Sequence, residues 1–290
     1  MHRSAPNFVR TVVFALPLAL MLAACDQSPA SPSATSRPDS ESNTIRLAGS
    51  VTDAAWRPLA GARVEVVDGP QLGLSTTTDA NGDYFLQGSF DNATRFRATK
   101  DGHAPSTFPL PPACEPCNPH WWIHFALEAL APKPNLSGDY SLTVTASSAC
   151  AALPDAVRSR TYEARVTLQS GQEFAPNSQF EVSVSTPPFL EQHRSFQLGV
   201  AGDYVGGFAG DLHGFPGLAE RITPTSYLAI GGSIAGSTDP SGSVVTASLS
   251  GVIDYCEVSS EMGQTFNCET GPVVAHKQCQ STHQLILRRR

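Results

Sequence analysis

The chain alternates hydrophobic and polar residues over short stretches that are separated by turn-forming residues. In "RVEVVD" Val64 and Val66 share one face, and in "TRFRAT" Phe96 and Ala98 do the same. A period of two residues is that of a β-strand with one buried face. Further stretches of this kind continue to about residue 130, and they predict a first folded unit over residues 45–130 that is built from strands.

The same pattern returns after the linker "APKPN" at residues 131–135. Tyr140, Leu142 and Val144 share one face of the next predicted strand, and the glycines of "SYLAIGGSIAGS" allow bulges or sharp curvature. About eight strands follow one another, with no helical period between most of them. Residues 136–290 are therefore expected to form an antiparallel β-barrel or a second β-sandwich, and the fold class of the chain is all-β.

Several motifs of the first unit occur in the order found in a known family. They are "GSVTD" at residues 49–53, "PLAGARV" at 58–64, "TTDANGDY" at 77–84 and "ATKDGH" at 98–103. Together they resemble the carboxypeptidase regulatory-like domain, which is a transthyretin-like β-sandwich. The resemblance implies an N-terminal sandwich of about seven strands that serves as an accessory or binding module, and it implies no catalysis.

The second unit opens with Gly138-Asp139-Tyr140 and closes with an arginine-rich strand. These features resemble lipocalin-like β-barrels, although Tyr140 stands where that family has a tryptophan. A barrel of eight strands is just wide enough to hold one small ligand.

Asp79, Asn81 and Asp83 are spaced like the start of a calcium-binding EF-hand loop. Phe90 occupies the twelfth position, where a glutamate would complete that loop. Asn81-Gly82 is also a strong signal for a β-hairpin turn, because both residues tolerate positive φ. We therefore expect a hairpin here and no bound metal.

The N-terminus has the composition of an export signal. Arg3 and Arg10 form a positive start that precedes the apolar segment Thr11–Ala24, which is too short to span a membrane as a helix. The segment ends in Leu22-Ala23-Ala24-Cys25, which resembles the bacterial lipobox. The resemblance implies cleavage before Cys25 and attachment of a diacylglyceryl group to its thiol, whose acyl chains would anchor the chain in a bilayer.

The N-terminal 44 residues are then expected to form two segments. Residues 1–24 are the lipoprotein signal peptide, and residues 25–44 form a Ser/Pro-rich disordered tether. The expected location is the bacterial cell envelope, at the periplasmic face of the inner or outer membrane or at the cell surface. The membrane is then a partner through the lipid anchor.

Charge and motif content argue against two classes of function, nucleic-acid binding and catalysis. The net charge of −7 gives no basic footprint, so nucleic acid is not an expected partner. The sequence contains no G-x-S-x-G, H-E-x-x-H or phosphate-binding P-loop motif, and its carboxylates form no recognisable acid/base pair. We expect no enzymatic activity and no cofactor.

Six cysteines besides Cys25 divide evenly between the two units, which predicts disulfides in an exported protein. Cys114 and Cys117 form the pair in the first unit. In the second unit Cys256 and Cys268 flank a hairpin-like loop, which leaves Cys150 near the first strand to pair with Cys279 near the last. First and last strands are neighbours in a closed barrel, so the second pairing would cross-link the closure.

The stretch "CEPCNPHWWIHFAL" combines cysteines and histidines in a way that suggests zinc or redox chemistry. On a strand, however, His120 and His124 lie about 13 Å apart, too far to share one zinc ion. A redox cysteine pair favours a helix N-terminus, whereas a β-rich run follows here. The pair is therefore expected to rigidify the loop, and the outward residues His120, Trp122 and His124 become the candidate ligand contacts.

These features favour a lipid-anchored envelope protein with a binding or accessory role. Trp122 could stack on a sugar ring, so carbohydrate or another envelope polymer is the expected ligand. One alternative is a carrier that holds a small apolar ligand inside the C-terminal barrel. A second alternative is a structural subunit of an envelope complex, whose partner would be another envelope protein.

Overall fold

The computed structural model describes residues 45–110, 120–169, 176–186, 189–210, 217–260, 268 and 273–290. In this part of the chain nearly all regular structure is strand, with one short 3-10 helix, η1 (Asp155–Val157). The all-β fold class is confirmed, and the second unit is a barrel. No helix among the described residues is long and apolar enough to cross a membrane.

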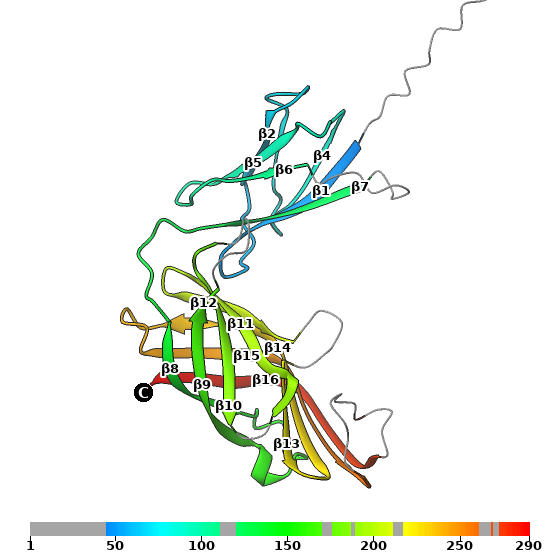
Figure 1. Ribbon diagram of the computed structural model, residues 1–290, viewed down its shortest axis with the longest axis vertical. Helices are drawn as coiled ribbons and strands as arrows, with labels where there is room; N and C mark the ends of the chain where they lie inside the picture. Colours follow the sequence, from blue (N-terminus) through cyan, green and yellow to red (C-terminus); the bar gives the residue numbers. More distant parts are fainter. Residues whose placement is uncertain are drawn as a thin grey trace, which may run out of the picture. The chain divides into compact units, whose positions relative to one another are not determined.

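Two sheets form the first unit (Figure 1). Sheet A has three strands, in the order β4 (Asp83–Gly88), β1 (Ile45–Asp53) and β7 (His120–Leu127). Sheet B has four strands, in the order β3 (Ser75–Thr77), β2 (Arg63–Asp68), β5 (Arg95–Thr99) and β6 (Ser106–Pro109). The central strand β1 pairs antiparallel with β4 and parallel with β7, so the first and last strands of the unit lie side by side.

One hydrophobic core joins the two sheets. Leu47 and Phe125 of sheet A and Phe96 of sheet B are fully buried in it. The rings of Phe108 on β6 and Phe125 on β7 meet edge to face, with centroids 5.4 Å apart. Burying one such side chain contributes about 1.5–3 kcal/mol, so these alternate positions hold the sandwich closed.

The turn around Asn81-Gly82 corrects one prediction. It forms as a tight turn, because the Asp79 carboxylate accepts hydrogen bonds from the backbone N–H groups of Asn81 and Asp83 at 2.8 and 2.9 Å. However, β3 belongs to sheet B and β4 to sheet A, so the predicted hairpin is wrong. Turn chemistry reverses the chain locally, whereas the buried face of the next strand decides which sheet it joins.

Eight antiparallel strands close the second unit into an up-and-down barrel, in which each strand pairs with the next and β16 pairs with β8 (Figure 1). In order around the barrel they are β8 (Gly138–Thr145), β9 (Ser159–Leu168), β10 (Gln179–Thr186), β11 (Phe189–Ala201), β12 (Tyr204–Ala209), β14 (Ser226–Thr238), β15 (Val244–Val258) and β16 (Val273–Arg289).

A short additional strand, β13 (Leu218–Thr223), shares one position in this wall with β12. Both strands pair with β11 on one side and β14 on the other. The sequence pattern does not indicate β13, because "LAERIT" is short and carries two charges. One of those charges, Glu220, is almost completely buried.

The barrel interior compensates this buried charge. The Arg160 side chain forms an ion pair with the Glu220 carboxylate, and the Tyr162 hydroxyl donates a hydrogen bond to it at 2.9 Å. Burial raises the pKa of Tyr162, so the hydroxyl stays protonated and remains a donor. A carboxylate removed from water requires such partners, because an unpaired buried charge would destabilise the fold by several kcal/mol.

Two disulfides lie in the second unit. Cys150 pairs with Cys279, and Cys256 pairs with Cys268, which are the two pairings expected from the sequence. The first links Cys150, just after β8, to Cys279 within β16, a few residues before the part of β16 that pairs with β8. Cys25, Cys114 and Cys117 lie outside the described residues, so their predicted roles stay predictions.

The two disulfides close loops of very different length, and we expect their removal to differ accordingly. Cys150 and Cys279 are 129 residues apart, whereas Cys256 and Cys268 are 12 apart. Chain entropy gives upper values of about 5 and about 3 kcal/mol for their contributions to stability. Denaturant unfolding of the Cys150→Ser/Cys279→Ser and Cys256→Ser/Cys268→Ser double variants measures both losses. Equal losses, or a larger loss for the short loop, would contradict the expectation.

Candidate functional site

Three side chains form a row across the outer face of sheet A. In the strand register Ala48 of β1 lies opposite Phe85 of β4 on one side and opposite Trp122 of β7 on the other. Their chain neighbours, such as Tyr84 and Ile123, point into the core. The row therefore places two aromatic rings on either side of one small residue.

Both aromatic side chains of this row are exposed. Trp122 is 65% exposed and Phe85 is 52% exposed. Neighbouring strands lie about 4.8 Å apart, so the two aromatic residues are separated by about 10 Å across the sheet. Ala48 does not fill the space between them. An exposed apolar surface of this kind typically marks an interaction site.

A polar row lies beside the aromatic one. Here Ser50 lies opposite Asp83 on β4 and His124 on β7. The Ser50 hydroxyl forms a hydrogen bond with Nδ1 of His124 at 2.9 Å, and the Thr52 hydroxyl lies 3.3 Å from Nε2. The face thus combines apolar rings with hydroxyl, imidazole and carboxylate groups.

The surroundings of the His124 ring favour its neutral form. Desolvation lowers the pKa of His124 below its usual value, although part of the residue remains exposed. A neutral imidazole has one donor nitrogen and one acceptor nitrogen. His124 can therefore hydrogen-bond with both hydroxyls, which fixes the ring next to Trp122.

Close approach of β1 and β7 keeps this face rigid. A Cβ atom on Gly49 would lie 1.8 Å from the backbone oxygen of Ile123, so only glycine fits at this position. The Tyr84 hydroxyl donates a hydrogen bond to the same oxygen at 3.0 Å. This contact ties β4 to β7 across β1 and holds all three strands in register.

Of the three candidate contacts named from the sequence, Trp122 and His124 lie on this outer face. His120 is the first residue of β7 and lies opposite Arg46, but its side chain is outside the described part of the structure. Phe85, Ala48 and Ser50 also lie on this face, although they are not among the contacts predicted from the sequence. The outward position of Phe85 in "DYFLQG" was a usable signal, since Tyr84 and Leu86 alternate with it as core residues.

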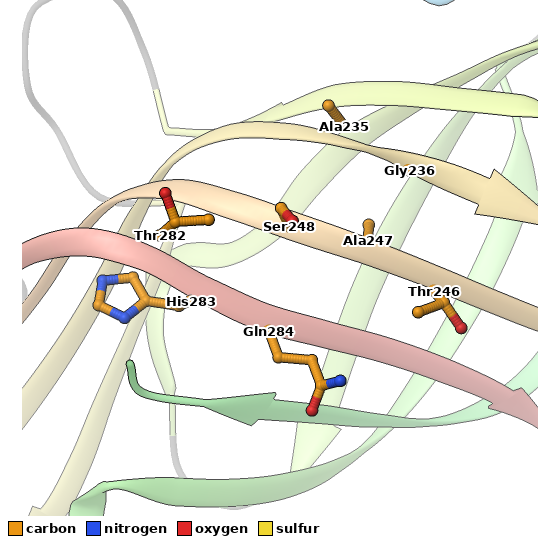
Figure 2. A pocket seen from close by; sticks show the side chains of 8 residues that line it. All are labelled: Ala235, Gly236, Thr246, Ala247, Ser248, Thr282, His283 and Gln284. Carbon is orange, nitrogen blue, oxygen red and sulfur yellow. The ribbon is translucent and has the colours of Figure 1, made fainter. Parts of the chain in front are cut away.

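A groove of about 350 Å³ lies on the barrel, where β14, β15 and β16 run side by side (Figure 2). Thr246, Ser248 and Gln284 contribute polar groups to its lining. His283 also lines it, but Nδ1 accepts a hydrogen bond from the Ser147 backbone N–H at 3.1 Å and Nε2 contacts the Gly251 carbonyl at 3.2 Å. These contacts give His283 a structural role, and the groove presents mainly hydroxyl and amide groups.

Comparison with known proteins agrees with the fold of the first unit. Residues 46–113 match the sequence model of the carboxypeptidase regulatory-like domain family. The first unit therefore carries a domain of this class, as the motifs indicated. No curated protein sequence matches the chain.

One solved structure with some likeness to the chain is described as a "putative membrane-associated protein of unknown function" from Bacteroides fragilis NCTC 9343. It shares 9% sequence identity with a TM-score of 0.24, over 85% of this chain and 98% of that one. At this TM-score the likeness carries no argument about fold or function.

The lowered pKa of His124 predicts a pH-dependent stability. In the unfolded chain the imidazole binds a proton near pH 6.5, whereas in the folded chain it does so only at a lower pH. The free energy of unfolding is therefore highest above pH 6.5 and decreases as the pH falls towards the folded-state pKa. Denaturant unfolding at pH 5 and pH 7 should show a smaller difference for His124→Gln than for the parent. Leu72→Ala, in the loop between β2 and β3, removes no titratable group and should keep the parent's difference. An unchanged difference in His124→Gln would contradict the prediction.

Proposed function

We propose that this protein is a lipid-anchored, non-catalytic binding protein of the bacterial cell envelope that recognises carbohydrate through the outer face of sheet A. One observation carries the proposal, namely the row formed by Phe85, Ala48 and Trp122. The two exposed aromatic side chains share one register row, on strands that are far apart in the sequence.

Carbohydrate matches the chemistry of this face. A pyranose ring presents C–H groups on its faces and hydroxyl groups around its edge. Aromatic rings offer a flat apolar surface for such C–H groups, while Ser50, Asp83 and His124 lie in the next row to bond with hydroxyls. An extended polymer suits the site best, because the row crosses the whole width of the three-stranded sheet.

A Ser–His contact on this face raises the question of catalysis, since Ser50 and His124 are hydrogen-bonded. A catalytic serine also needs its base to be oriented by a third group and needs donors aimed at a developing oxyanion. The other ring nitrogen of His124 contacts the Thr52 hydroxyl instead of a carboxylate. Backbone N–H groups at the centre of the sheet serve strand pairing. These features favour a hydrogen-bonding role for the pair.

The lipid anchor rests on the sequence around Cys25. A positive start, an apolar run, two small residues and the cysteine occur in the order that lipoprotein processing requires. A diacylglyceryl group at Cys25 would hold both folded units at a bilayer surface, where envelope polymers are within reach.

The barrel interior favours this proposal over the carrier alternative. Described side chains that face inward, among them Tyr140, Leu198, Leu249 and Leu287, belong to one hydrophobic cluster. In such a cluster the side chains themselves fill an eight-stranded barrel. The barrel then serves as a stable body for the protein.

Trp122→Ala should weaken binding to the recognised glycan about tenfold, because it removes a stacking surface worth about 1.4 kcal/mol. Phe85→Ala should weaken it similarly. Suitable measurements are a glycan array and co-sedimentation with peptidoglycan and other envelope polysaccharides, using the full mature chain with Cys25→Ser to keep it soluble.

Leu72→Ala is the matched control for this experiment, because it removes an equally exposed apolar side chain from a loop of the same unit. It should bind like the parent. If the parent binds none of the glycans or polymer fractions, the proposal is wrong. Binding that survives both aromatic substitutions would place the site elsewhere.

Cys25→Ser tests the anchor separately. The parent expressed in a bacterial host should incorporate radiolabelled palmitate and enter the detergent phase on Triton X-114 partitioning, whereas Cys25→Ser should do neither. Ser31→Ala in the same segment should behave like the parent. A Cys25→Ser variant that still carries the label would rule out this residue as the lipid attachment site.

A further inference from the structure

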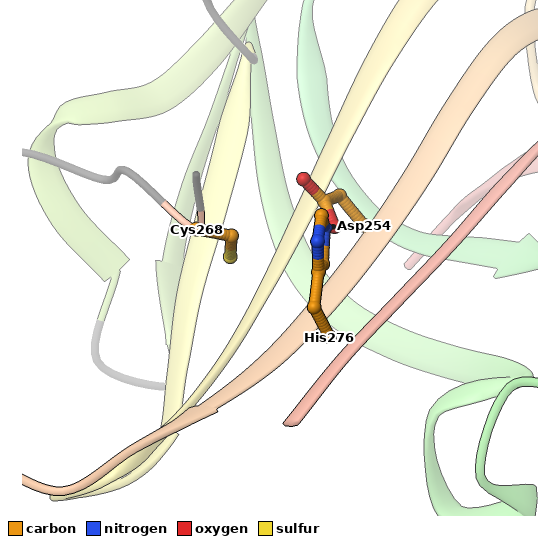
Figure 3. A group of neighbouring side chains, drawn as sticks. All are labelled: Asp254, Cys268 and His276. Atoms are coloured by element: carbon orange, nitrogen blue, oxygen red, sulfur yellow. Dashed lines mark hydrogen bonds and ion pairs between the residues drawn. The ribbon is translucent and has the colours of Figure 1, made fainter. Parts of the chain in front are cut away.

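The short disulfide lies next to a histidine and an aspartate at one end of the barrel wall. Cys256 on β15 is paired in register with His276 on β16, and Asp254 lies two residues before Cys256 on the same strand. One ligand atom each from Asp254, Cys268 and His276 lie within 4.8 Å of one another (Figure 3). Among the described residues, Asp254, Cys268 and His276 thus form a cluster of side chains of the types that bind metal ions.

The two cysteines are buried, and the histidine and the aspartate contact each other. Cys256 and Cys268 are buried and belong to a small hydrophobic cluster with Tyr227 and Val258. Nε2 of His276 lies 2.6 Å from Oδ1 of Asp254, and the two side chains are 33% and 13% exposed. An ion arriving from solvent could therefore reach the histidine and the aspartate, and the sulfur of the buried Cys268 lies within 4.8 Å of their ligand atoms.

The donor set matches zinc once the sulfurs are thiolates. Zinc binds cysteine sulfur at about 2.3 Å and histidine nitrogen or carboxylate oxygen at about 2.0–2.2 Å, in a tetrahedron. Ligand atoms in such a tetrahedron are about 3.3–3.8 Å apart, so the three atoms of Asp254, Cys268 and His276, which lie within 4.8 Å of one another, need only small shifts. Cys256, which lies opposite His276 in the strand register, would supply the fourth ligand. In the disulfide, by contrast, the sulfurs are uncharged and bonded to each other, and the thiolate is the form that binds metal.

We propose that reduction of the Cys256–Cys268 disulfide creates a zinc site made of Cys256, Cys268, His276 and Asp254. A dithiol protein of the thioredoxin type supplies two electrons and two protons, so the chain's disulfide becomes two thiols and the dithiol becomes a disulfide. The two thiols would release their protons to solvent as their sulfurs bind the metal. The imidazole proton moves to Nδ1, and Nε2 exchanges its hydrogen bond with Asp254 for a bond to the metal.

Zinc titration of the full mature chain tests this inference, with Cys25→Ser for solubility and Cys114→Ser/Cys117→Ser to remove the other close cysteine pair. After reduction with a phosphine, one zinc ion should bind per chain, at least 100-fold more tightly than to the oxidised chain. Cobalt(II) should give the intense visible bands of a tetrahedral site and a sulfur-to-cobalt charge-transfer band.

His276→Gln and Asp254→Asn should each weaken zinc binding at least tenfold, whereas His103→Gln in the first unit should leave it unchanged. Circular dichroism of each reduced protein shows whether the barrel remains folded. Stoichiometric binding that is unaffected by both substitutions would come from other thiols, those of Cys150 and Cys279 or those of an unfolded chain, and this result would overturn the proposal. Equal affinity of the oxidised and reduced chains, or no binding to either, would also overturn it.

Discussion

The parallel pairing of β1 with β7 is the interaction on which the first unit depends. It joins the first and the last strand of the unit, which lie far apart in the sequence. The same backbone register places Leu47 beside Trp121 towards the core and Ala48 beside Trp122 on the outer face. Core packing and the proposed binding face therefore have one common cause, and Gly49 allows it by leaving room for the neighbouring carbonyl.

In the second unit the first and last strands also pair, and this pairing closes the sheet into a barrel. Pairing of β8 with β16 removes the free strand edges that would otherwise be open to pairing with other chains. The Cys150–Cys279 disulfide fixes this closure covalently. Inside the barrel, Arg160 and Tyr162 donate hydrogen bonds to the buried Glu220 carboxylate. These contacts connect β9 to the short strand β13.

Local patterns in the sequence predicted much of this arrangement. Alternation identified the outward position of Trp122 and His124, and the even number of cysteines with barrel closure identified both disulfides of the second unit. The partners across strands were not predictable in this way. Phe85 joins Trp122 only through the register of three strands, and Asn81-Gly82 signals a turn without saying which sheet receives the next strand. Such pairings depend on contacts between distant segments, which no local period encodes.

The two-residue period of β4 and β7 also separates two kinds of evolutionary constraint. Tyr84, Leu86, Ile123 and Phe125 must keep filling the core, whereas Phe85 and Trp122 contribute little to it. Substitutions at the outward positions can thus alter what the surface recognises without disturbing the fold that carries it. A domain built in this way can acquire new specificities by changing a few surface residues.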